Sequence, residues 1–262
     1  MHLVHILGCS SFTAVQRSTT IIRITTLRSS IGGEEGALSA PPRIAKIKEA
    51  LDKEANLGWD GALYLQQYKE FANYFDSKKL SPYFSTLDGL TQAMGKVSLE
   101  HQGRKIENVR INNTADGYTV NGWEAEILDN HSGVVDCYRN PKADPAILAY
   151  YNQPLYVAIK TRQQVVKASE KVLTDFYIVN EKELKGSHIL SLVVKDTLGA
   201  ELFQKEIPVN IIGGEVYGQL IAEGIEIPTG KVGGMCKISA VLKDASGKEV
   251  ATGREFFLTV NN

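Results

Sequence analysis

Short apolar segments separated by turn residues fill the chain after Pro145 and limit what it can fold into. There are seven of them, at residues 155–160, 172–179, 189–195, 202–209, 216–221, 236–242 and 255–260. Short strands bounded by Gly, Asp, Asn and Pro are typical of an all-β sandwich. The segment VVKDTLGAE at 193–201 is echoed by VLKDASGKE at 241–249, and both predict a hairpin turn in which Gly supplies a positive φ.

The region before Pro145 predicts helices instead. The first follows Pro42 and repeats apolar residues at helical spacing, at Ile44, Ile47, Ala50 and Leu51. The second carries one aromatic face that we expect to be core, formed by Tyr64, Tyr68, Phe71 and Phe75. The third covers residues 90–110 despite two glycines, and it leads to a strand that begins at Tyr118 and continues to Asn121.

Composition excludes several classes of function. The 262 residues, 43% hydrophobic and 23% charged, suit an ordinary globular protein with one large domain or two smaller ones. A formal net charge of −1 offers no basic surface for nucleic acid. No apolar run approaches the roughly 20 residues of a membrane span. Cys9, Cys137 and Cys236 are too far apart for a disulfide framework or a metal site, so we expect free thiols, no metal and no cofactor.

Residues 1–30 differ from the rest of the chain. They contain no Asp or Glu and are rich in Ser, Thr and Arg. The start resembles a lipoprotein or transit signal only in part, because too few residues precede Cys9 for a signal. We leave this segment unassigned and interpret it as an artefact of where the reading frame begins.

A polar loop follows the strand at Tyr118 and carries groups suited to a sugar. An indole face can lie against a pyranose ring while carboxylates and an amide bind its hydroxyls. The candidate substrate-binding residues are Trp123, Glu124, Glu126, Asn130 and His131. Trp59 and Asp60, in an earlier GWDG loop, can reach a cleft as easily as they can cap a helix. From spacing alone, the region around 133–142 can also be a strand, a loop and a buried Asp and Arg pair without a ligand.

The next stretch, GVVDCYRNPK, resembles the segment that closes the catalytic barrel in glycoside hydrolase family two, the group of beta-galactosidases and beta-glucuronidases. In that family a Gly, two apolar residues, Asp, Arg, Pro and Lys follow the eighth strand. The matching residues are Gly133, Val134, Val135, Asp136, Arg139, Pro141 and Lys142. The resemblance implies a carbohydrate substrate and a retaining hydrolysis of beta-linked sugars.

The resemblance also implies a nucleophile. In the family it is a Glu at the end of the seventh strand, followed by an aromatic residue and Gly. Glu34, Glu35 and Gly36 fit that spacing, with Glu34 as the first choice for the nucleophile. Glu35 stands where the family has an aromatic residue, which makes it the second choice. On the motif alone, an acidic pair after two glycines can equally be a solvated loop or a cap on the following helix.

A retaining glycosidase needs a second carboxyl group as acid and base, about 5 to 5.5 Å from the nucleophile. In the family this Glu follows the fourth strand, whereas the first 33 residues here contain no carboxylate. A whole barrel also takes roughly 250 residues. We therefore expect the missing barrel strands in the same full-length protein, no independent turnover from this chain, and, by analogy with full-length relatives, an exported or periplasmic protein.

The predicted fold class is α/β plus all-β, with the C-terminal portion of a TIM (β/α)8 barrel followed by an immunoglobulin-like β-sandwich. The predicted division is an unassigned segment at 1–30, a partial barrel domain at 31–154 and the sandwich domain at 155–262. A noncatalytic carbohydrate-binding or bracing module is the alternative. A dinucleotide site at IIGGEVYG, residues 211–218, is rejected because the glycine spacing and the helix are missing.

Overall fold

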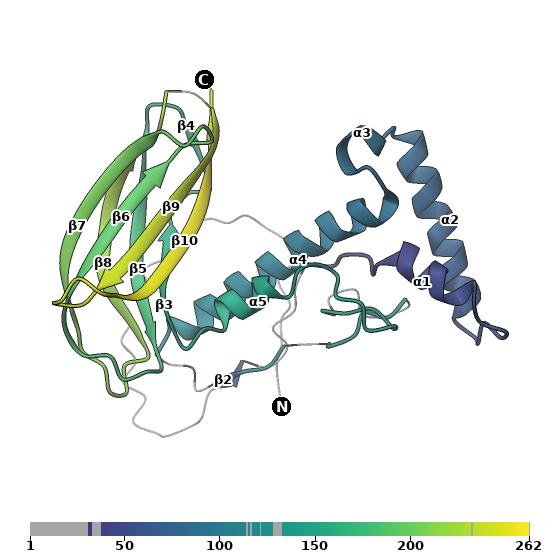
Figure 1. Cartoon of the computed structure of the whole chain (residues 1–262), viewed down its shortest axis with the longest axis horizontal. Helices are drawn as coiled ribbons and strands as arrows, with labels where there is room; N and C mark the ends of the chain where they lie inside the picture. Colours follow the sequence, from purple (N-terminus) through teal and green to yellow (C-terminus); the bar gives the residue numbers. More distant parts are fainter. Residues whose placement is uncertain are drawn as a thin grey trace, which may run out of the picture.

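The computed structural model describes residues 31–32, 38–113, 115, 117–120, 122–127, 133–231 and 233–261. Helices occupy one part of the molecule and a pair of sheets the other, and the longest helix runs from one to the other (Figure 1). No helix in these ranges is both long and apolar enough to cross a membrane. The fold is thus mixed, with helices first and sheets after them in the chain.

The first part is a short parallel strand pair joined through helices. Its elements are β1 (Ile31–Gly32), α1 (Ile44–Leu51), α2 (Gly61–Ser77), α3 (Ser81–Phe84), α4 (Leu87–Arg110), β2 (Gly117–Tyr118) and α5 (Ala146–Tyr151). Ile31 lies opposite Gly117 and Gly32 opposite Tyr118, in parallel. Parallel strands need a long crossover, which here is α1 to α4, with α4 returning the chain to the start of β2.

The three predicted helices are confirmed. Ile44, Ile47 and Leu51 of α1 are buried against Tyr64 of α2, as the helical spacing predicts. The rest of the aromatic face follows, because Phe75 is buried and Tyr68 and Phe71 pack partly buried on that cluster. Thr86 caps α4 by accepting a hydrogen bond from the Gly89 amide at 3.0 Å.

The strand predicted from Tyr118 to Asn121 is shorter than expected. Only Gly117 and Tyr118 are in a strand, and Asn121 lies outside the described residues. The alternation of side chains alone does not make a strand, because a strand also needs a partner backbone beside it.

All seven predicted strands are present, with an eighth that the sequence did not predict. They are β3 (Leu155–Thr161), β4 (Val165–Lys167), β5 (Lys171–Asn180), β6 (Gly186–Lys195), β7 (Glu201–Ile211), β8 (Gly218–Pro228), β9 (Gly234–Lys243) and β10 (Glu249–Val260). They form a five-stranded sheet in the order β4-β10-β9-β6-β7 and a three-stranded sheet in the order β3-β5-β8. Both sheets contribute to one apolar core, which includes Phe176 and Ile178 from one and Leu192 and Ile238 from the other.

The two echoed segments form the same turn. Asp196 Oδ1 accepts from the amides of Leu198 and Ala200 at 2.9 and 2.8 Å, and Gly199 has a φ of +85°. In the second turn Asp244 Oδ1 accepts from the amides two and four residues later at 2.9 and 3.0 Å, and Gly247 has a φ of +84°. The predicted role of Gly in both hairpins is confirmed.

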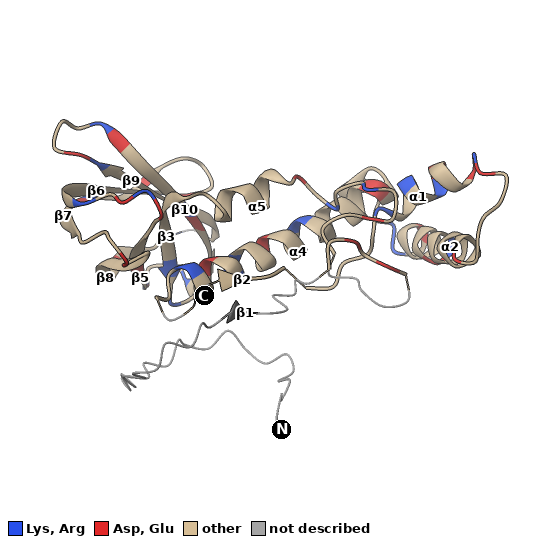
Figure 2. Cartoon of the chain, turned by 90° about the horizontal axis from the view of Figure 1, so that it is seen from below, with Lys and Arg blue, Asp and Glu red and all other residues tan. Residues whose placement is uncertain are grey.

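Three ion pairs tie the end of α4 to the sheets and to the loop after β5. Arg104 pairs with Glu255 of β10 at 2.6 Å, and Glu107 pairs with Lys160 of β3 at 2.5 Å. The acidic partners retain only 7% and 4% of their side-chain exposure. Arg110 makes the third pair, with Glu181 at 2.6 Å, and also donates to the carbonyls of Tyr151 and Gln153. Figure 2 shows the charged positions of α4 and the neighbouring strands in blue and red.

Helix α5 lies against α4 at a position that only Gly can occupy. A Cβ at Gly103 would be 2.0 Å from Cδ2 of Tyr151. Beside it, the Tyr150 hydroxyl accepts from the Arg254 amide at 2.9 Å, and the Arg254 guanidinium lies 4.6 Å from the Tyr150 ring centroid. Helix α5 therefore connects α4 with β10.

Replacing Gly103 by Ala is expected to reduce the free energy of unfolding by about 1–3 kcal/mol, because the new methyl group must push back the Tyr151 ring. An Ala in an unobstructed helix would have the opposite effect. Urea unfolding followed by circular dichroism measures the change. Gly117→Ala is the control, since a Cβ there has nothing within 4 Å. An unchanged or higher midpoint for Gly103→Ala contradicts this packing.

Candidate functional site

Most candidate residues come from loops that follow the two parallel strands, whereas Trp59 and Asp60 come from the loop between α1 and α2. In an α/β barrel, the loops after the carboxyl ends of the strands carry the active site. Glu34 and Glu35 follow β1 by two and three residues, and Trp123 follows β2 by five. Glu34, Glu35, Asn130 and His131 lie outside the described residues, so their roles stay predictions.

Trp123 starts a short backbone pairing with the family-like motif. Its carbonyl accepts from the amides of Val134 and Val135 at 2.9 and 3.1 Å, and the Ala125 amide donates to the Val135 carbonyl at 2.8 Å. Gly133 allows this approach, because a Cβ there would be 2.3 Å from the Ala125 nitrogen. The Trp123 side chain remains 61% exposed, as a ring platform requires. Glu124 is half-buried and Glu126 is exposed.

Asp136 holds the tight turn after this pairing. Its side chain is fully buried, and Oδ1 accepts from the amides of Tyr138 and Asn140 at 2.9 and 2.8 Å. The Asn140 side-chain amide donates to Oδ2 at 3.0 Å. Arg139 is exposed and pairs with Glu124, at 3.5 Å between Nη1 and Oε2. In the ligand-free alternative the pairing of Asp136 with an Arg is therefore wrong, because backbone amides and Asn140 satisfy the buried aspartate and Arg139 pairs with Glu124.

The Asp136 turn has the same geometry as the two sandwich hairpins. Each has an Asp that accepts from the amides two and four residues later. The residue three after the Asp has a positive φ, which is +66° at Arg139 and +85° and +84° at Gly199 and Gly247. A side chain at this φ costs about 1 kcal/mol or more. Arg139 therefore occupies, with backbone strain, a turn position that is Gly in both of the other turns.

Helix α4 fixes both candidate loops along one face. Buried Ser98 donates to the Leu38 carbonyl at 2.6 Å, just beyond the predicted nucleophile. One turn earlier, a Cβ at Gly95 would be 2.4 Å from the Lys142 carbonyl oxygen. The buried Lys142 ammonium donates to the Ala40 carbonyl at 2.8 Å, and its burial lowers its pKa to about 8. The chain after Glu34 and the end of the motif are therefore joined on one stretch of α4.

Trp59 and Asp60 lie near a hollow of about 230 Å³ between the α1–α2 loop and the Asp136 turn. Trp59 is 76% exposed, and half-buried Asp60 lines the hollow. Cys137 and Tyr138 line its other side. Cys137 and Tyr138 belong to the family-like motif, but no role was predicted for them from the sequence. The α1–α2 loop that faces them is about 80 residues away in the chain, so the sequence does not show that they are neighbours.

The Cys137 thiol lies among acidic groups in this region. Burial raises its pKa, the hydrogen bond from the Tyr64 hydroxyl opposes the rise, and the carboxylates of Asp136, Asp60 and Glu124 add to it. Asp60 and Glu124, two predicted substrate-binding residues from separate loops, thus both raise the pKa of this thiol. The thiol itself is a poor nucleophile at neutral pH, since the thiolate is the reactive form.

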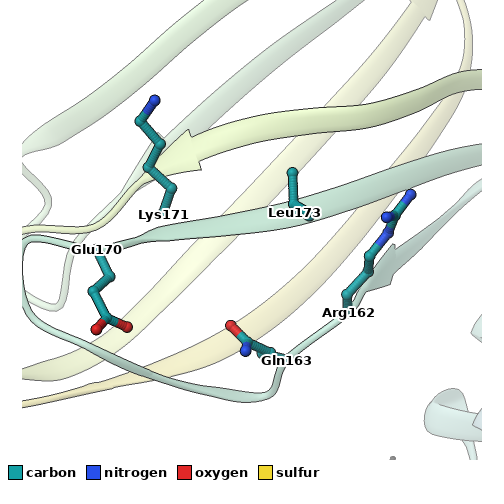
Figure 3. Close-up of a pocket in the computed structure, with 5 residues that line it drawn as sticks. All are labelled: Arg162, Gln163, Glu170, Lys171 and Leu173. Carbon is teal, nitrogen blue, oxygen red and sulfur yellow. The ribbon is translucent and has the colours of Figure 1, made fainter. Parts of the chain in front are cut away.

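A second hollow, of about 510 Å³, lies on the sheets (Figure 3). It is lined by Arg162, Gln163, Glu170, Lys171 and Leu173, none of them aromatic. The two cations already pair with carboxylates of neighbouring strands, Arg162 with Asp175 and Lys171 with Glu226. Without a ring platform this hollow is less suited to a sugar than the first. In the described ranges no group of three or more His, Cys, Asp or Glu is arranged to hold a metal ion.

No family model and no curated protein matches the chain. Among solved structures, a beta-D-mannosidase from Dictyoglomus thermophilum matches over 87% of this chain, with 14% identity and a TM-score of 0.50. A glycosyl hydrolase family 2 member from Bacteroides cellulosilyticus matches over 40%, with 15% identity and a TM-score of 0.32. A beta-glucuronidase from Bacteroides uniformis matches over 38%, with 13% identity and a TM-score of 0.30.

This chain spans 27% of the length of the mannosidase, 15% of the family 2 member and 12% of the glucuronidase. At such identities the similarity concerns the fold alone. The mixed fold, with helices and separate β-sheets, is thus similar to part of the Dictyoglomus thermophilum beta-D-mannosidase structure.

Replacing Arg139 by Gly is expected to raise the free energy of unfolding by up to about 1 kcal/mol, because the strained φ of +66° is relieved. The Glu124 ion pair that is lost contributes about 0–1 kcal/mol at its exposed position. The reverse change in the equivalent hairpin, Gly199→Ala, is the control and should lower stability. Chemical unfolding of both variants measures this, and a loss of stability in Arg139→Gly would contradict it.

Lys142 makes stability depend on alkaline pH. Its folded pKa, about 8, lies below the ordinary value of 10.5, so between these values the unfolded chain binds more protons. Its contribution to the free energy of unfolding should therefore rise from pH 8 to 10.5. We expect Lys142→Met to remove this part of the slope in urea midpoints, and the exposed control Lys96→Met to retain it. Equal slopes in all three proteins are the contrary result.

Proposed function

We propose that residues 31–154 contribute the nucleophile end of a retaining glycosidase barrel that acts on beta-linked sugars, beta-galactosidase-like in its class. The observation that carries this proposal is the attachment of two loops to one face of α4. Ser98 holds the chain after Glu34, and Gly95 and Lys142 hold the end of the loop that carries Trp123. The parallel pairing of β1 with β2 supports a barrel edge on which both loops start.

In the proposed mechanism Glu34 attacks the anomeric carbon and forms a glycosyl ester as the bond to the leaving oxygen breaks. A second carboxylic acid, from upstream barrel strands, protonates that oxygen. The same group then removes a proton from water, which attacks the anomeric carbon and releases Glu34. Glu35 is the second choice for the nucleophile.

The remaining predicted residues would bind the sugar. The exposed ring of Trp123 would lie against the pyranose face, and Glu124 and Glu126 would accept from its hydroxyls. Asn130 and His131 would add to these hydrogen bonds. Trp59 and Asp60 belong to the neighbouring α1–α2 loop and would contact a further part of the substrate.

The β-sheets at residues 155–262 are proposed as an immunoglobulin-like brace. Their ion pairs with α4 support this role, because Arg104 and Glu107 each bind a different strand. The second candidate function is a noncatalytic carbohydrate-binding or bracing module. Its support is the continuous apolar core of the sheets, which requires none of the upstream helices. Sugar binding that survives deletion of everything before Tyr150 would favour the module.

Hydrolysis of a panel of chromogenic beta-glycosides tests the proposed function. We compare this chain, a protein with the upstream barrel restored, and the restored protein with Glu34→Gln. Only the restored protein should be active, and Glu34→Gln should lower kcat by about a thousandfold or more. Glu49→Gln, an exposed carboxylate on α1, is the control and should leave kcat unchanged. An inert restored protein, or full activity in Glu34→Gln, rejects the proposal.

A further inference from the structure

The geometry points to a second sugar subsite in the hollow between the α1–α2 loop and the Asp136 turn, shaped for a neutral pyranose unit. This inference deepens the proposed function and rests on it for the catalytic neighbour. It assigns a substrate class, uncharged beta-linked saccharides, to a hollow lined by the α1–α2 loop and by Cys137 and Tyr138 of the family-like motif. It also gives Tyr138 a role as a sugar-binding ring.

The topology places this hollow beside the predicted catalytic loops. Helices α1 to α3 form the insertion that leaves the carboxyl end of β1 and precedes the return through α4. The Asp136 turn belongs to the loop that leaves the carboxyl end of the parallel strand β2. The two walls thus come from the connections that follow β1 and β2, which the proposed function places on the active-site edge of a barrel. Helix α1, the loops and α2 are seen together at one end of α4 in Figure 1.

The lining combines a ring with hydrogen-bonding groups, as sugar subsites require. Glu54, Asn56 and Asp60 supply carboxylate and amide groups from one wall. Tyr138 faces them from the other, with its hydroxyl 3.4 Å from Glu54 Oε1. Its side chain keeps 38% of its exposure, which leaves surface for a pyranose. Leu51, at 6% exposure, lies on the apolar side of the hollow.

One wall is already fixed without a ligand. Tyr64 is 3% exposed, and its hydroxyl hydrogen-bonds to the Cys137 sulfur and to the backbone at Ile127. The Asp136 carboxylate accepts hydrogen bonds from the amides of Tyr138 and Asn140. These bonds fix the turn that carries Cys137 and Tyr138. A preformed wall reduces the ordering that a ligand must bring about when it binds.

Charge selects the kind of sugar. The residues that line the hollow include two carboxylates, Glu54 and Asp60, and neither Lys nor Arg. A uronic acid or a sulfated sugar would place an anion beside them, which like-charge repulsion disfavours. Hydroxyl groups of a neutral sugar can instead donate to both. The nearby cation of Arg139 is paired with Glu124.

Alkylation of Cys137 by iodoacetamide at alkaline pH, where more of the thiol is ionised, reports on occupancy, because the half-buried thiol lines the hollow. The full chain is treated with and without methyl beta-glycosides of glucose, galactose and mannose, and the Cys137 peptide is quantified by mass spectrometry. At least one neutral glycoside should slow its modification several-fold. Methyl beta-glucuronide, which differs from the glucoside only in its carboxylate, should not.

Two variants test the assigned residues. Tyr138→Ala and Asp60→Asn should lose the protection, and both change partly exposed side chains outside the apolar core. Tyr83→Ala, at an exposed tyrosine on α3, is the control and should keep it. Circular dichroism confirms that each variant is folded.

Absence of protection by every neutral glycoside, equal protection by the glucuronide, or unchanged protection in Tyr138→Ala overturns the subsite. These outcomes are separate from those of the hydrolysis test. Protection in this chain together with an inert restored enzyme would retain the subsite and reject the glycosidase. Hydrolysis that depends on Glu34 without protection at Cys137 would reject the subsite alone.

Discussion

The buried charges where α4 meets the sheets are the constraint on which the rest of the structure depends. Glu107 and Glu255 are almost fully removed from water, and each has a basic partner on the other side of the joint. Separating such a pair within a buried interface leaves an uncompensated charge, which costs about 3–5 kcal/mol. The pairs therefore favour one position of α4 relative to the sheets. The close packing of Gly103 against the Tyr151 ring of α5 restricts that position further.

A helix fixed at one end can organise loops near its other end. Ser98 and Gly95 lie in the middle of α4 and hold the two chain segments that flank the candidate site. The sheets need no sugar contact of their own in this account. They determine where α4 lies, and α4 determines where the loops after β1 and β2 meet.

The sequence predicted the helices and most strands well, because periodic burial decides them. The prediction failed where contacts between residues distant in the chain determine the structure. Strand β10 begins at Glu249, six residues before the predicted start, and it contains Gly253, where a Cβ would be 2.1 Å from the Val157 carbonyl oxygen. The motif predicted Asp136 and Lys142 as a group, but their hydrogen bonds, to Asn140 and Ala40, depend on the folded loops. The hollow at Tyr138 lies between two loops that are distant in the chain. No periodic pattern in the sequence connects these loops, so the hollow could not be predicted.

Covalent trapping tests the central claim most directly. An activated 2-deoxy-2-fluoro glycoside glycosylates the nucleophile of a retaining glycosidase, with loss of its activated leaving group, and the glycosyl ester stays intact long enough for peptide mapping. With the upstream barrel restored, the account predicts one label, on the peptide that contains Glu34. A label on a carboxylate outside residues 31–154, or turnover without any trapped ester, would contradict the claim that this chain carries the nucleophile.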